Sequence, residues 1–389
     1  YTALGGLSAA IYNEVLQFFV IVAALLPLTV VALHKVGGWD GIKERVQPGP
    51  GQLSSWPGTT LTGIDSPILS VIGIIFGLGF VLSFGYWTTN FVEVQRAMAS
   101  NSISAARRSP IIGSFPKMFI PFIVVIPGII AAIIVPELSD YKAAGGTGGN
   151  VDYNDAILLL MRDLLPNGML GVAIAGLIAS FMAGMAANIS AFNTVFSYDI
   201  WQQYIVKDKP DNHYTAVGRY ATVAATLIAI GTAFIASGYS NLMNYLQTLF
   251  GFFNAPLFAT FILGMFWKKM SPSAGWVGLV SGTVAAVVVA VLSEDSLGSL
   301  STGALPLTGQ GASFVAAGAA FVVDIIVSFV VTLATRPKPE AELEGLVYSL
   351  TPKQTMTDSE KSRLAWYQSP TKLAGVGLVL VIVLNLIFH

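Results

Sequence analysis

The sequence predicts an all-α integral membrane protein that crosses the bilayer about nine times. Hydrophobic residues make up 54% of its 389 residues, charged residues make up only 11%, and the mean hydropathy is +0.70. Long apolar stretches recur along the chain, and a helix needs about 20 apolar residues to cross a hydrocarbon core about 30 Å thick. This composition excludes a soluble enzyme.

Nine stretches of the sequence are apolar and long enough to cross the bilayer. They are residues 10–34, 67–92, 111–135, 168–200, 216–236, 242–267, 272–292, 312–335 and 371–388. In lipid the backbone must satisfy its own hydrogen bonds, so each stretch is expected to be a helix. The sequence between them contains no separate soluble domain, and we expect one polytopic membrane domain over residues 1–389.

The loops between these stretches differ in positive charge. Lys and Arg number 14 in one alternate set of loops and 5 in the other. The first set comprises residues 93–110, 201–219, 268–271 and 336–372, and the second comprises residues 35–66, 136–167 and 293–311. Cytoplasmic loops carry the excess of Lys and Arg, so the first set is expected to face the cytoplasm, with residues 336–371 as a cytoplasmic linker. The predicted location is the cell (inner) membrane.

The loop 136–167, predicted to lie outside the cell, is acidic. Its carboxylates belong to Glu137, Asp140, Asp152, Asp155 and Asp163. Two interpretations fit, a solvated acidic surface or a trap for cations. The solvated surface is the simpler of the two, because acidic residues are usually exposed.

The first stretch carries one acidic residue, Glu14, near its predicted cytoplasmic end. Asn13 and Gln17 accompany it. Ionisable residues in membrane segments often have a function. Helix capping or solvation at the membrane interface explains Glu14 equally well.

The second stretch turns polar before it leaves the predicted membrane. Its polar side chains are those of Ser83, Tyr86, Trp87, Thr88, Thr89 and Asn90, and three glycines, Gly77, Gly79 and Gly85, are expected to loosen the helix there. Unpaired polar groups are costly in hydrocarbon. Such a helix is typical of one that lines a watery cavity for a polar solute, as in secondary transporters. The alternative is an aromatic belt at the lipid headgroups, but a belt does not require Ser83 or the glycines.

The third stretch contains a lysine, Lys117, directly after Pro116. Pro121 and Pro127 follow in the same stretch. Proline removes helix hydrogen bonds, so Lys117 is expected where hydrogen bonds of the helix are already missing. The alternative is that the lysine snorkels to the cytoplasmic face.

The fourth stretch has a strip of small residues at a spacing of four. One row is Ala175, Ala179, Ala183 and Ala187, and the row beside it is Gly176, Ser180, Gly184 and Asn188. Residues four apart share a helix face, so another helix can approach and backbone carbonyls can be reached. Close packing of helices explains the spacing equally well.

Two later stretches carry polar groups at membrane depth. Gln247 precedes Gly251 and the break expected at Asn254-Ala255-Pro256, and paired interrupted helices indicate a transporter site. Asp324 lies in an otherwise apolar stretch, and we expect it to have a structural partner.

Several kinds of chemistry have no sequence signal. The chain has no cysteine and only three histidines, which are too scattered for a metal site. No nucleophile and base pair, phosphate-binding loop or metal motif is present, so catalysis, an organic cofactor and a nucleic-acid partner are not expected.

Several short motifs, taken in order, resemble the sodium:solute symporter family, and most closely its sodium/glucose and sodium/galactose cotransporters. They are residues 3–9 (ALGGLSA), 86–90 (YWTTN), 94–96 (VQR), 115–117 (FPK), 196–200 (FSYDI) and 263–269 (LGMFWKK). The resemblance covers nearly the whole chain, and no single motif would suffice.

The resemblance implies a LeuT-type inverted-repeat transporter fold with solute and sodium bound midway through the membrane. The family's sugar contacts fall on Ser83, Tyr86, Trp87, Asn90, Lys117 and Gln247. Lysine donates hydrogen bonds and glutamine both donates and accepts them, which suits a polyol. The family's acidic residue near the sodium exit falls on Glu14.

Two departures from the family pattern bear on function. A sodium site of the family uses two adjacent hydroxyl residues, and here those positions are Ala183 and Gly184. Ser180, one turn earlier, could supply one oxygen for the ion. The match also begins at the last helix of the first repeat, followed by the second repeat and three accessory helices. We therefore expect the preceding helices on a longer protein or on a separate polypeptide.

The sequence thus predicts a sodium-coupled transporter that works by alternating access on a sugar or a similar polar solute. The alternative is a degenerate family member that serves as a structural or sensory subunit. Ala183 and Gly184 favour that alternative, whereas Lys117, Gln247 and the Tyr86-Trp87 pair favour the transporter.

Overall fold

The computed structural model describes residues 1–46, 66–144, 151–237, 242–294, 297, 300–352 and 365–387. Over these residues the chain is helical, and nine helices are long and apolar enough to cross a membrane. They span Thr2–Val36, Ile68–Thr89, Ile103–Ile134, Asn167–Ile205, Asp211–Ala236, Leu242–Phe266, Pro272–Leu292, Gly309–Ala334 and Pro370–Ile387. The nine predicted stretches are thereby confirmed, although the first helix begins eight residues earlier and the fourth ends five residues later than expected.

The chain folds as two compact units, each made of two separate segments. The first unit is Tyr1–Pro48 with Phe115–Leu242, and the second is Gly49–Ser114 with Met243–His389. The boundary falls within α6 (Ile103–Ile134), which is one continuous helix despite its prolines.

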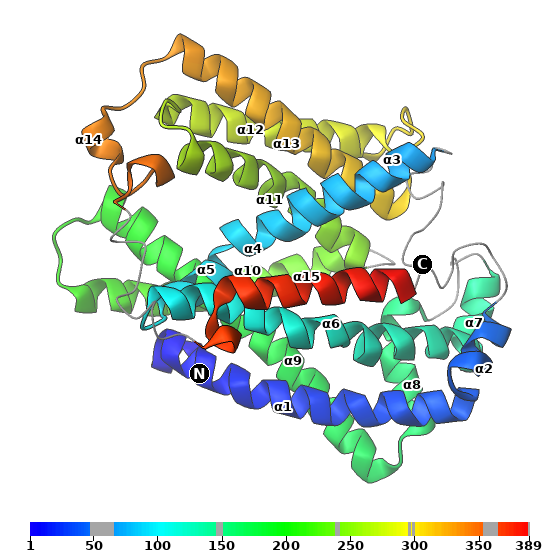
Figure 1. Ribbon diagram of the computed structural model, residues 1–389. Helices are drawn as coiled ribbons and strands as arrows, with labels where there is room; N and C mark the ends of the chain where they lie inside the picture. Colours follow the sequence, from blue (N-terminus) through cyan, green and yellow to red (C-terminus); the bar gives the residue numbers. More distant parts are fainter. Residues whose placement is uncertain are drawn as a thin grey trace. The chain divides into compact units, whose positions relative to one another are not determined.

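In the first unit, α1 (Thr2–Val36) packs against α9 (Asn167–Thr194), as can be followed in Figure 1. Small residues allow this close approach, because a Cβ atom added at Gly176 would collide with the Cβ of Ala24. α10 (Asp211–Ala236) packs against both helices, and a π-helical segment, Val195–Ile205, continues α9. α1 is kinked at Gly6, whose φ of 60° is readily adopted only by glycine.

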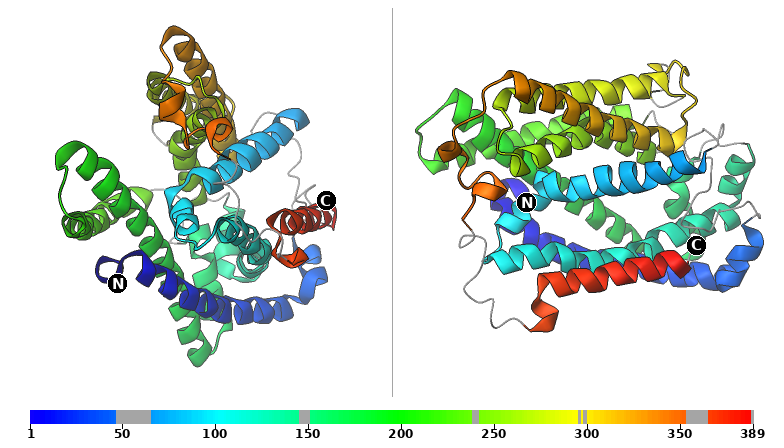
Figure 2. Two further views of the ribbon diagram at one scale, coloured as in Figure 1. Left: turned by 60° about the vertical axis from the view of Figure 1, so that its left-hand side comes forward. Right: turned by 45° about the horizontal axis from the view of Figure 1, so that its top comes forward.

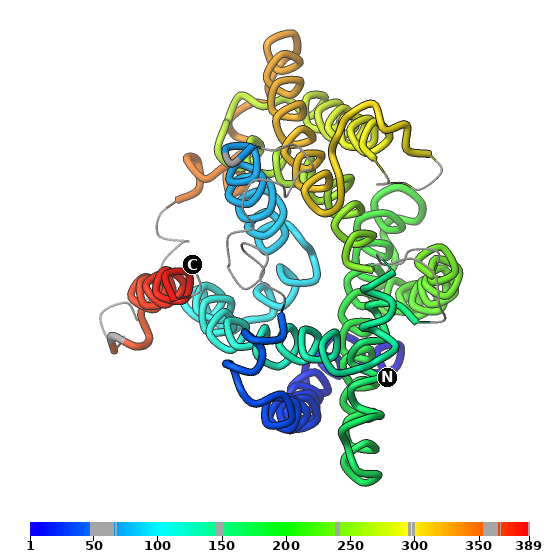
Figure 3. Tube along the Cα trace, turned by 90° about the vertical axis from the view of Figure 1, so that its right-hand side faces the viewer, coloured from blue at the N-terminus to red at the C-terminus, as the bar shows by residue number. Residues whose placement is uncertain are grey.

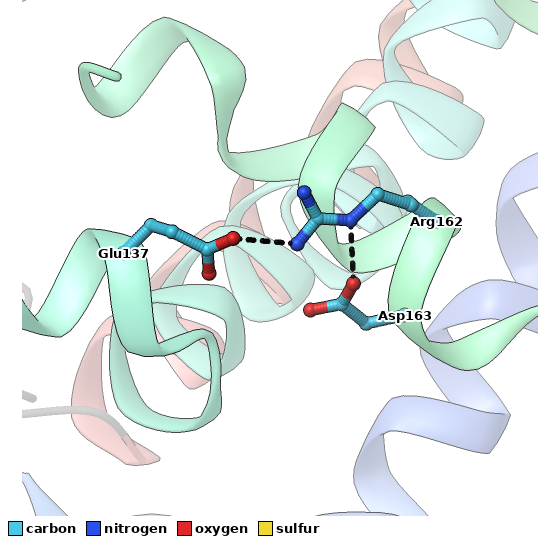
Figure 4. Close-up of polar contacts among 3 residues, drawn as sticks. All are labelled: Glu137, Arg162 and Asp163. Carbon is cyan, nitrogen blue, oxygen red and sulfur yellow. Dashed lines mark hydrogen bonds and ion pairs between the residues drawn. The ribbon is translucent and has the colours of Figure 1, made fainter. Parts of the chain in front are cut away.

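Two short helices of the first unit are joined by an ion-pair cluster, drawn in Figure 4. Arg162 of α8 (Ala156–Leu164) donates one hydrogen bond to Glu137 of α7 (Pro136–Ala143) at 2.8 Å and another to Asp163 at 2.7 Å. The Arg162 guanidinium lowers the pKa of the Glu137 carboxyl, and the two carboxylates raise the pKa of Arg162. Two acids of the acidic loop are therefore already paired, which favours the solvated surface over a cation trap.

The second unit is built around α11 (Leu242–Phe266), α12 (Pro272–Leu292) and α13 (Gly309–Ala334). Figure 2 shows α12 and α13 side by side, and in Figure 3 the blue segment of the second span lies beside α13. Aromatic rings fill the space between these helices. Phe80 contacts Phe258 at 5.3 Å and Phe321 at 5.6 Å between ring centroids, both edge to face. Phe258 is 1% exposed and lies in the buried core.

The second span is a continuous helix with a wide central portion. It comprises α3 (Pro67–Ile72), a π-helical segment Gly73–Phe84 and α4 (Gly85–Thr89). The helix ends at Asn90, which is extended (φ −68°, ψ 121°) and begins α5 (Phe91–Met98). π-Helical turns are rare and are frequent at functional sites.

Two of the three glycines of this helix, Gly77 and Gly85, also have close neighbours. A Cβ at Gly77 would lie 2.5 Å from the carbonyl oxygen of Phe314, and one at Gly85 would lie 2.8 Å from the ring of Phe258. Both glycines are therefore explained by close packing against α13 and α11. The expected break of α11 at residues 254–256 is absent, since Pro256 lies inside one helix. A proline removes a single helix hydrogen bond, and helices in membranes tolerate that loss.

The remaining described elements are short or peripheral. α2 (Gly38–Arg45) follows α1, and α15 (Pro370–Ile387) is the last span. α14 (Glu340–Leu343) lies in the predicted cytoplasmic linker and is held by an ion pair of 2.6 Å between Lys268 and Glu340. Part of that linker, residues 353–364, lies outside the described residues.

Candidate functional site

Two rows of residues meet where the second span ends. Tyr86 and Thr89 are one turn apart, and Gln247, Phe250 and Asn254 share a face of α11 by their spacing of three and four. The ring of Tyr86 lies 5.3 Å from that of Phe250, and Thr89 Oγ1 lies 3.5 Å from Asn254 Oδ1. These two contacts bring the two rows together. Both helices belong to the second unit.

Three other predicted contact residues lie on or directly after the same helix. Ser83 is exposed and lies one turn before Tyr86, just as Gln247 lies one turn before Phe250. Trp87 is half-buried. Asn90 closes the helix and its side chain accepts a hydrogen bond of 2.8 Å from the backbone N–H of Val92, so part of its bonding capacity is used for capping.

Gln247 is half-buried near the start of α11. Its amide nitrogen lies 3.9 Å from the sulfur of Met243, a weak acceptor. Its neighbour Thr248 turns to another face and contacts Ser313 of α13 at 3.2 Å between hydroxyl oxygens. The packing of Thr248 on α13 thus fixes the rotation of α11 about its axis. This rotation sets the direction of the face that Gln247 shares with Phe250 and Asn254.

The sixth sugar-contact position, Lys117, belongs to the first unit, whereas the other five belong to the second. Lys117 is exposed on α6, and the helix is continuous through Pro116 and Pro121. Pro116 and Pro121 have no N–H to donate, and the helix keeps its form despite these missing hydrogen bonds.

The small-residue strip on α9 has two different surroundings. In its first half Gly176 and Ala179 are buried and Gly176 packs on α1, as close packing predicts, whereas Ala175 is exposed. Ser180 is exposed, Ala183 is half-buried, and a Cβ added at Gly184 would meet nothing within 4 Å. Helix packing within the described residues thus explains Gly176 and Ala179 and leaves the second half of the strip unexplained.

Backbone oxygens of this second half are engaged by side chains. Asn188 donates a hydrogen bond of 2.9 Å to the Gly184 carbonyl, and Tyr1 donates one of 3.3 Å to the Met182 carbonyl. Carbonyls of this helix are therefore within reach of polar groups, as the predicted cation site requires.

Glu14 lies well inside α1, which begins at Thr2. Capping is therefore ruled out as the explanation of this residue, because only the first turn of a helix has unsatisfied N–H groups. Asn13 donates a hydrogen bond of 2.8 Å to the Ala9 carbonyl, and Gln17 is 7% exposed. Within the part of the chain that the structure describes, the buried Gln17 Oε1 has no hydrogen-bond partner.

Sequence reasoning missed a polar cavity of about 370 Å³ in the first unit. It lies between the start of α1, the end of α9 and the first half of α10. Asn193 lines it and donates a hydrogen bond of 3.0 Å to Thr222, another lining residue. Tyr198 donates a hydrogen bond of 2.8 Å to Asp211. The signal available in the sequence was the motif at 196–200, which supplies Ser197 and Tyr198 to its lining.

Sequence reasoning also gave Asn254 only the role of a helix breaker. Asn254 is 8% exposed, and among the described residues its amide nitrogen has no hydrogen-bond partner. A buried amide nitrogen without an acceptor is costly, which makes Asn254 a candidate to bind a solute oxygen. Its spacing of seven from Gln247 was the signal that could have found it.

The fold and these helices define a multi-pass membrane protein of LeuT-type transporter architecture. The structure is similar to a solved structure titled "Substrate-bound outward-open state of a Na+-coupled sialic acid symporter reveals a novel Na+-site", with a TM-score of 0.64, 18% identity, and coverage of 87% of this chain and 65% of that chain. A sequence model described as "Sodium:solute symporter family" matches residues 1–282. The chain belongs to the sodium:solute symporter family, a family of transporters.

Curated relatives match most of the chain. The "Sodium/glucose cotransporter" of Vibrio parahaemolyticus is 30% identical over 294 residues, which are 72% of this chain and 53% of the relative. "Sodium/glucose cotransporter 1" of Oryctolagus cuniculus is 27% identical over 380 residues, 90% of this chain and 56% of the relative. "Sodium/myo-inositol cotransporter 2" of Sus scrofa is 28% identical over 313 residues, 75% of this chain and 46% of the relative. The chain thus spans about half the length of these relatives.

Proposed function

We propose that the complete transporter containing this chain couples the entry of sodium to the uptake of a sugar or a related polyol by alternating access. Family membership supports transport, and the printed names of the relatives include cotransporters for glucose and myo-inositol. The carrying observation is the contact of the Tyr86 and Thr89 row with the row of Gln247, Phe250 and Asn254.

The side chains of these two rows support a polyol site on chemical grounds. Gln247 and Asn254 present amides that donate and accept hydrogen bonds, and the rings of Tyr86 and Phe250 present apolar faces. A sugar has hydroxyl groups at its rim and C–H groups on its faces, so both kinds of surface are used. Ser83, Trp87 and Asn90 of the second unit would complete the set, and the role of Lys117 stays a prediction from the family resemblance.

The sodium ion is proposed to bind the open half of the α9 strip. Ser180 supplies a hydroxyl oxygen there, and backbone carbonyls near Ala183 and Gly184 supply the other oxygens. The proposed exit path passes Glu14 of α1. The polar cavity lined by Asn193 and Ser197 would give a hydrated ion room near the same ends of α1 and α9.

Two further expectations stay predictions. One is that a separate polypeptide or a longer form of the protein supplies the helices that precede Tyr1 in the family, which the mass of the purified transporter would test. The other is that residues 1–389 form one polytopic domain in the cell membrane. The comparisons give no support to the alternative of a non-transporting subunit.

Equilibrium binding of labelled glucose and myo-inositol to the complete transporter tests the solute site. Lys117→Ala and Gln247→Ala should each weaken binding by about 1–3 kcal/mol, the cost of a hydrogen bond lost from a charged or buried group. The matched controls are Arg107→Ala, on the same helix as Lys117, and Gln203→Ala, an exposed glutamine. Unchanged affinity in both test variants, or an equal loss in the controls, would remove the proposed sugar site.

A further inference from the structure

A carboxyl group is completely buried among three helices of the second unit. Asp324 lies in the middle of α13 and is 0% exposed. Its Oδ2 accepts a hydrogen bond of 2.8 Å from Thr260 of α11, and its Oδ1 lies 2.9 Å from the hydroxyl of Ser328, one turn later. Figure 1 shows α11, α12 and α13 grouped together. The proposed function gives this group no role.

The helices around Asp324 offer no compensating charge. α11, α12, α13 and the π-helical segment Gly73–Phe84 contain no Lys, Arg, His or Glu and no other Asp in their sequences. No ion pair of Asp324 exists among the described residues. An unpaired carboxylate in such surroundings loses its hydration without a cation in exchange, which is very costly.

A count of hydrogens shows how the group can be satisfied. Three oxygen pairs of 3.1 Å or less form a chain, because Ser328 Oγ also lies 3.1 Å from the Ala274 carbonyl of α12, while Thr260 has only a longer contact of 3.5 Å with the Gly275 carbonyl. Three such pairs need three hydrogens, and the hydroxyls of Thr260 and Ser328 supply two. A carboxylic acid supplies the third by donating from Oδ1 to Ser328, which then donates to Ala274.

The packing leaves no space for a metal ion in this cluster. The oxygen pairs are already at direct hydrogen-bond distances of 2.8 and 2.9 Å. A Cβ added at Gly278 would lie 2.6 Å from Asp324 Oδ1 and would also collide with Ser328 Oγ. A hard cation gathers about six oxygens around itself. The smallest cation, a proton, is the one that fits between the oxygens.

We propose that Asp324 is a proton-binding site, at which a neutral carboxylic acid ties α13 to α11 and α12. Thr260 lies on the same helix as Gln247 and Asn254, so the acid is a positioning residue for the helix that carries the candidate solute site. The proposal requires neither sodium coupling nor sugar binding, because it depends only on contacts inside the second unit.

Infrared difference spectroscopy of the complete purified transporter tests the protonation directly. Subtracting the spectrum of Asp324→Asn from that of the parent should leave one carbonyl band of a protonated carboxylic acid, and this band should shift in deuterium oxide. Glu340→Gln, an exposed acid, is the control and should leave that band in place. Absence of the band from the parent spectrum, or its persistence in Asp324→Asn, would overturn the proposal.

Thermal unfolding of the same variants tests the tie between the helices. Asparagine can donate to Ser328 and accept from Thr260, so Asp324→Asn should keep a Tm close to that of the parent, whereas Asp324→Ala should lower it by several degrees. If Asp324→Ala does not fold, the Asp324→Asn comparison and the infrared band still decide. A sodium-dependent rise of Tm that disappears in Asp324→Asn alone would identify a cation site and contradict the proposal.

Discussion

Gly176 and Gly184 lie on the same face of α9 and meet different surroundings. Gly176 is pressed against Ala24, while an added Cβ at Gly184 has open space around it. A repeat of small residues is therefore not one feature, because helix packing explains Gly176 but not Gly184. The open half is where the family's sodium site would lack its two hydroxyl groups.

At Gly184, we predict that serine is tolerated and strengthens sodium binding. The open space admits the side chain, and each hydroxyl can replace a water that sodium otherwise keeps. Solute binding measured against sodium concentration should shift to lower sodium in Gly184→Ser, and further in Ala183→Ser with Gly184→Ser.

Gly176→Ser is the matched control for this experiment. It should lower Tm and leave the sodium dependence unchanged, because its side chain would collide with Ala24 of α1. A sodium dependence that neither Gly184→Ser nor Ser180→Ala alters would place the ion elsewhere.

The Glu137 to Arg162 ion pair should give a pH-dependent contribution to stability. Arg162 lowers the pKa of the Glu137 carboxyl in the folded state, so this stabilisation is present above the ordinary glutamate pKa of about 4.3 and is lost as the pH falls through the lower folded-state value. The Tm difference between the parent and Glu137→Gln should therefore be present at neutral pH and vanish in acid.

Asp140→Asn, on the same helix and outside the described ion pairs, is the control for this pH series. The effect is small, because exposed ion pairs contribute little to stability. A Tm difference for Glu137→Gln that grows on acidification would contradict the assignment of the pair.

At the scale of the helix, the second span is held by close packing on one side and carries polar groups at its end. The sequence predicted both the span and the polar residues from hydropathy. It did not predict that Gly77 and Gly85 serve packing, because a glycine in a sequence indicates equally a flexible backbone or a close neighbour. The neighbours, Phe314 and Phe258, are more than 170 residues away in the chain.

Gly85→Ala should destabilise the second unit by about 1–3 kcal/mol through overpacking. The added methyl would lie 2.8 Å from the ring of Phe258, which is 1% exposed and cannot move into solvent. Thermal unfolding measures the effect, with Gly128→Ala of α6 as the control, since a Cβ there meets nothing within 4 Å. Equal Tm values for Gly85→Ala and Gly128→Ala would show that the methyl group added at Gly85 causes no overpacking against Phe258.

The candidate site also depends on contacts between residues that are distant in the chain, which the sequence does not show. Sequence reasoning placed Tyr86 and Gln247 in one site through the family resemblance, and the spacing along α11 was visible without a structure. It could not show that Thr248 packs on Ser313, and this contact is what fixes the rotation of α11. Asn254 was missed for the same reason, because the following proline indicated a break where the helix continues.

At the scale of the whole molecule, composition and hydropathy were sufficient for the fold class and for all nine spans. They could not show the division into two units, because each unit joins segments that are distant in the chain. The orientation in the membrane remains a prediction from the distribution of basic residues between alternate loops.

Single-cysteine labelling tests that orientation, and the chain has no native cysteine to interfere. A cysteine introduced at Asp140 should react with an impermeant reagent in intact cells, and one at Glu340 should react only after permeabilisation. The reverse pattern would invert the topology. Reaction of both cysteines in intact cells would place the two loops on the same side of the membrane. One of the helices between them would then not cross it.

The most direct test of the central claim is uptake of labelled glucose and myo-inositol into proteoliposomes that contain the complete transporter. An inward sodium gradient should drive accumulation of one of these solutes above its external concentration, and Gln247→Ala should reduce this accumulation, whereas Gln203→Ala should not. Equal uptake with and without the sodium gradient, or full accumulation by the Gln247→Ala variant, would contradict the account.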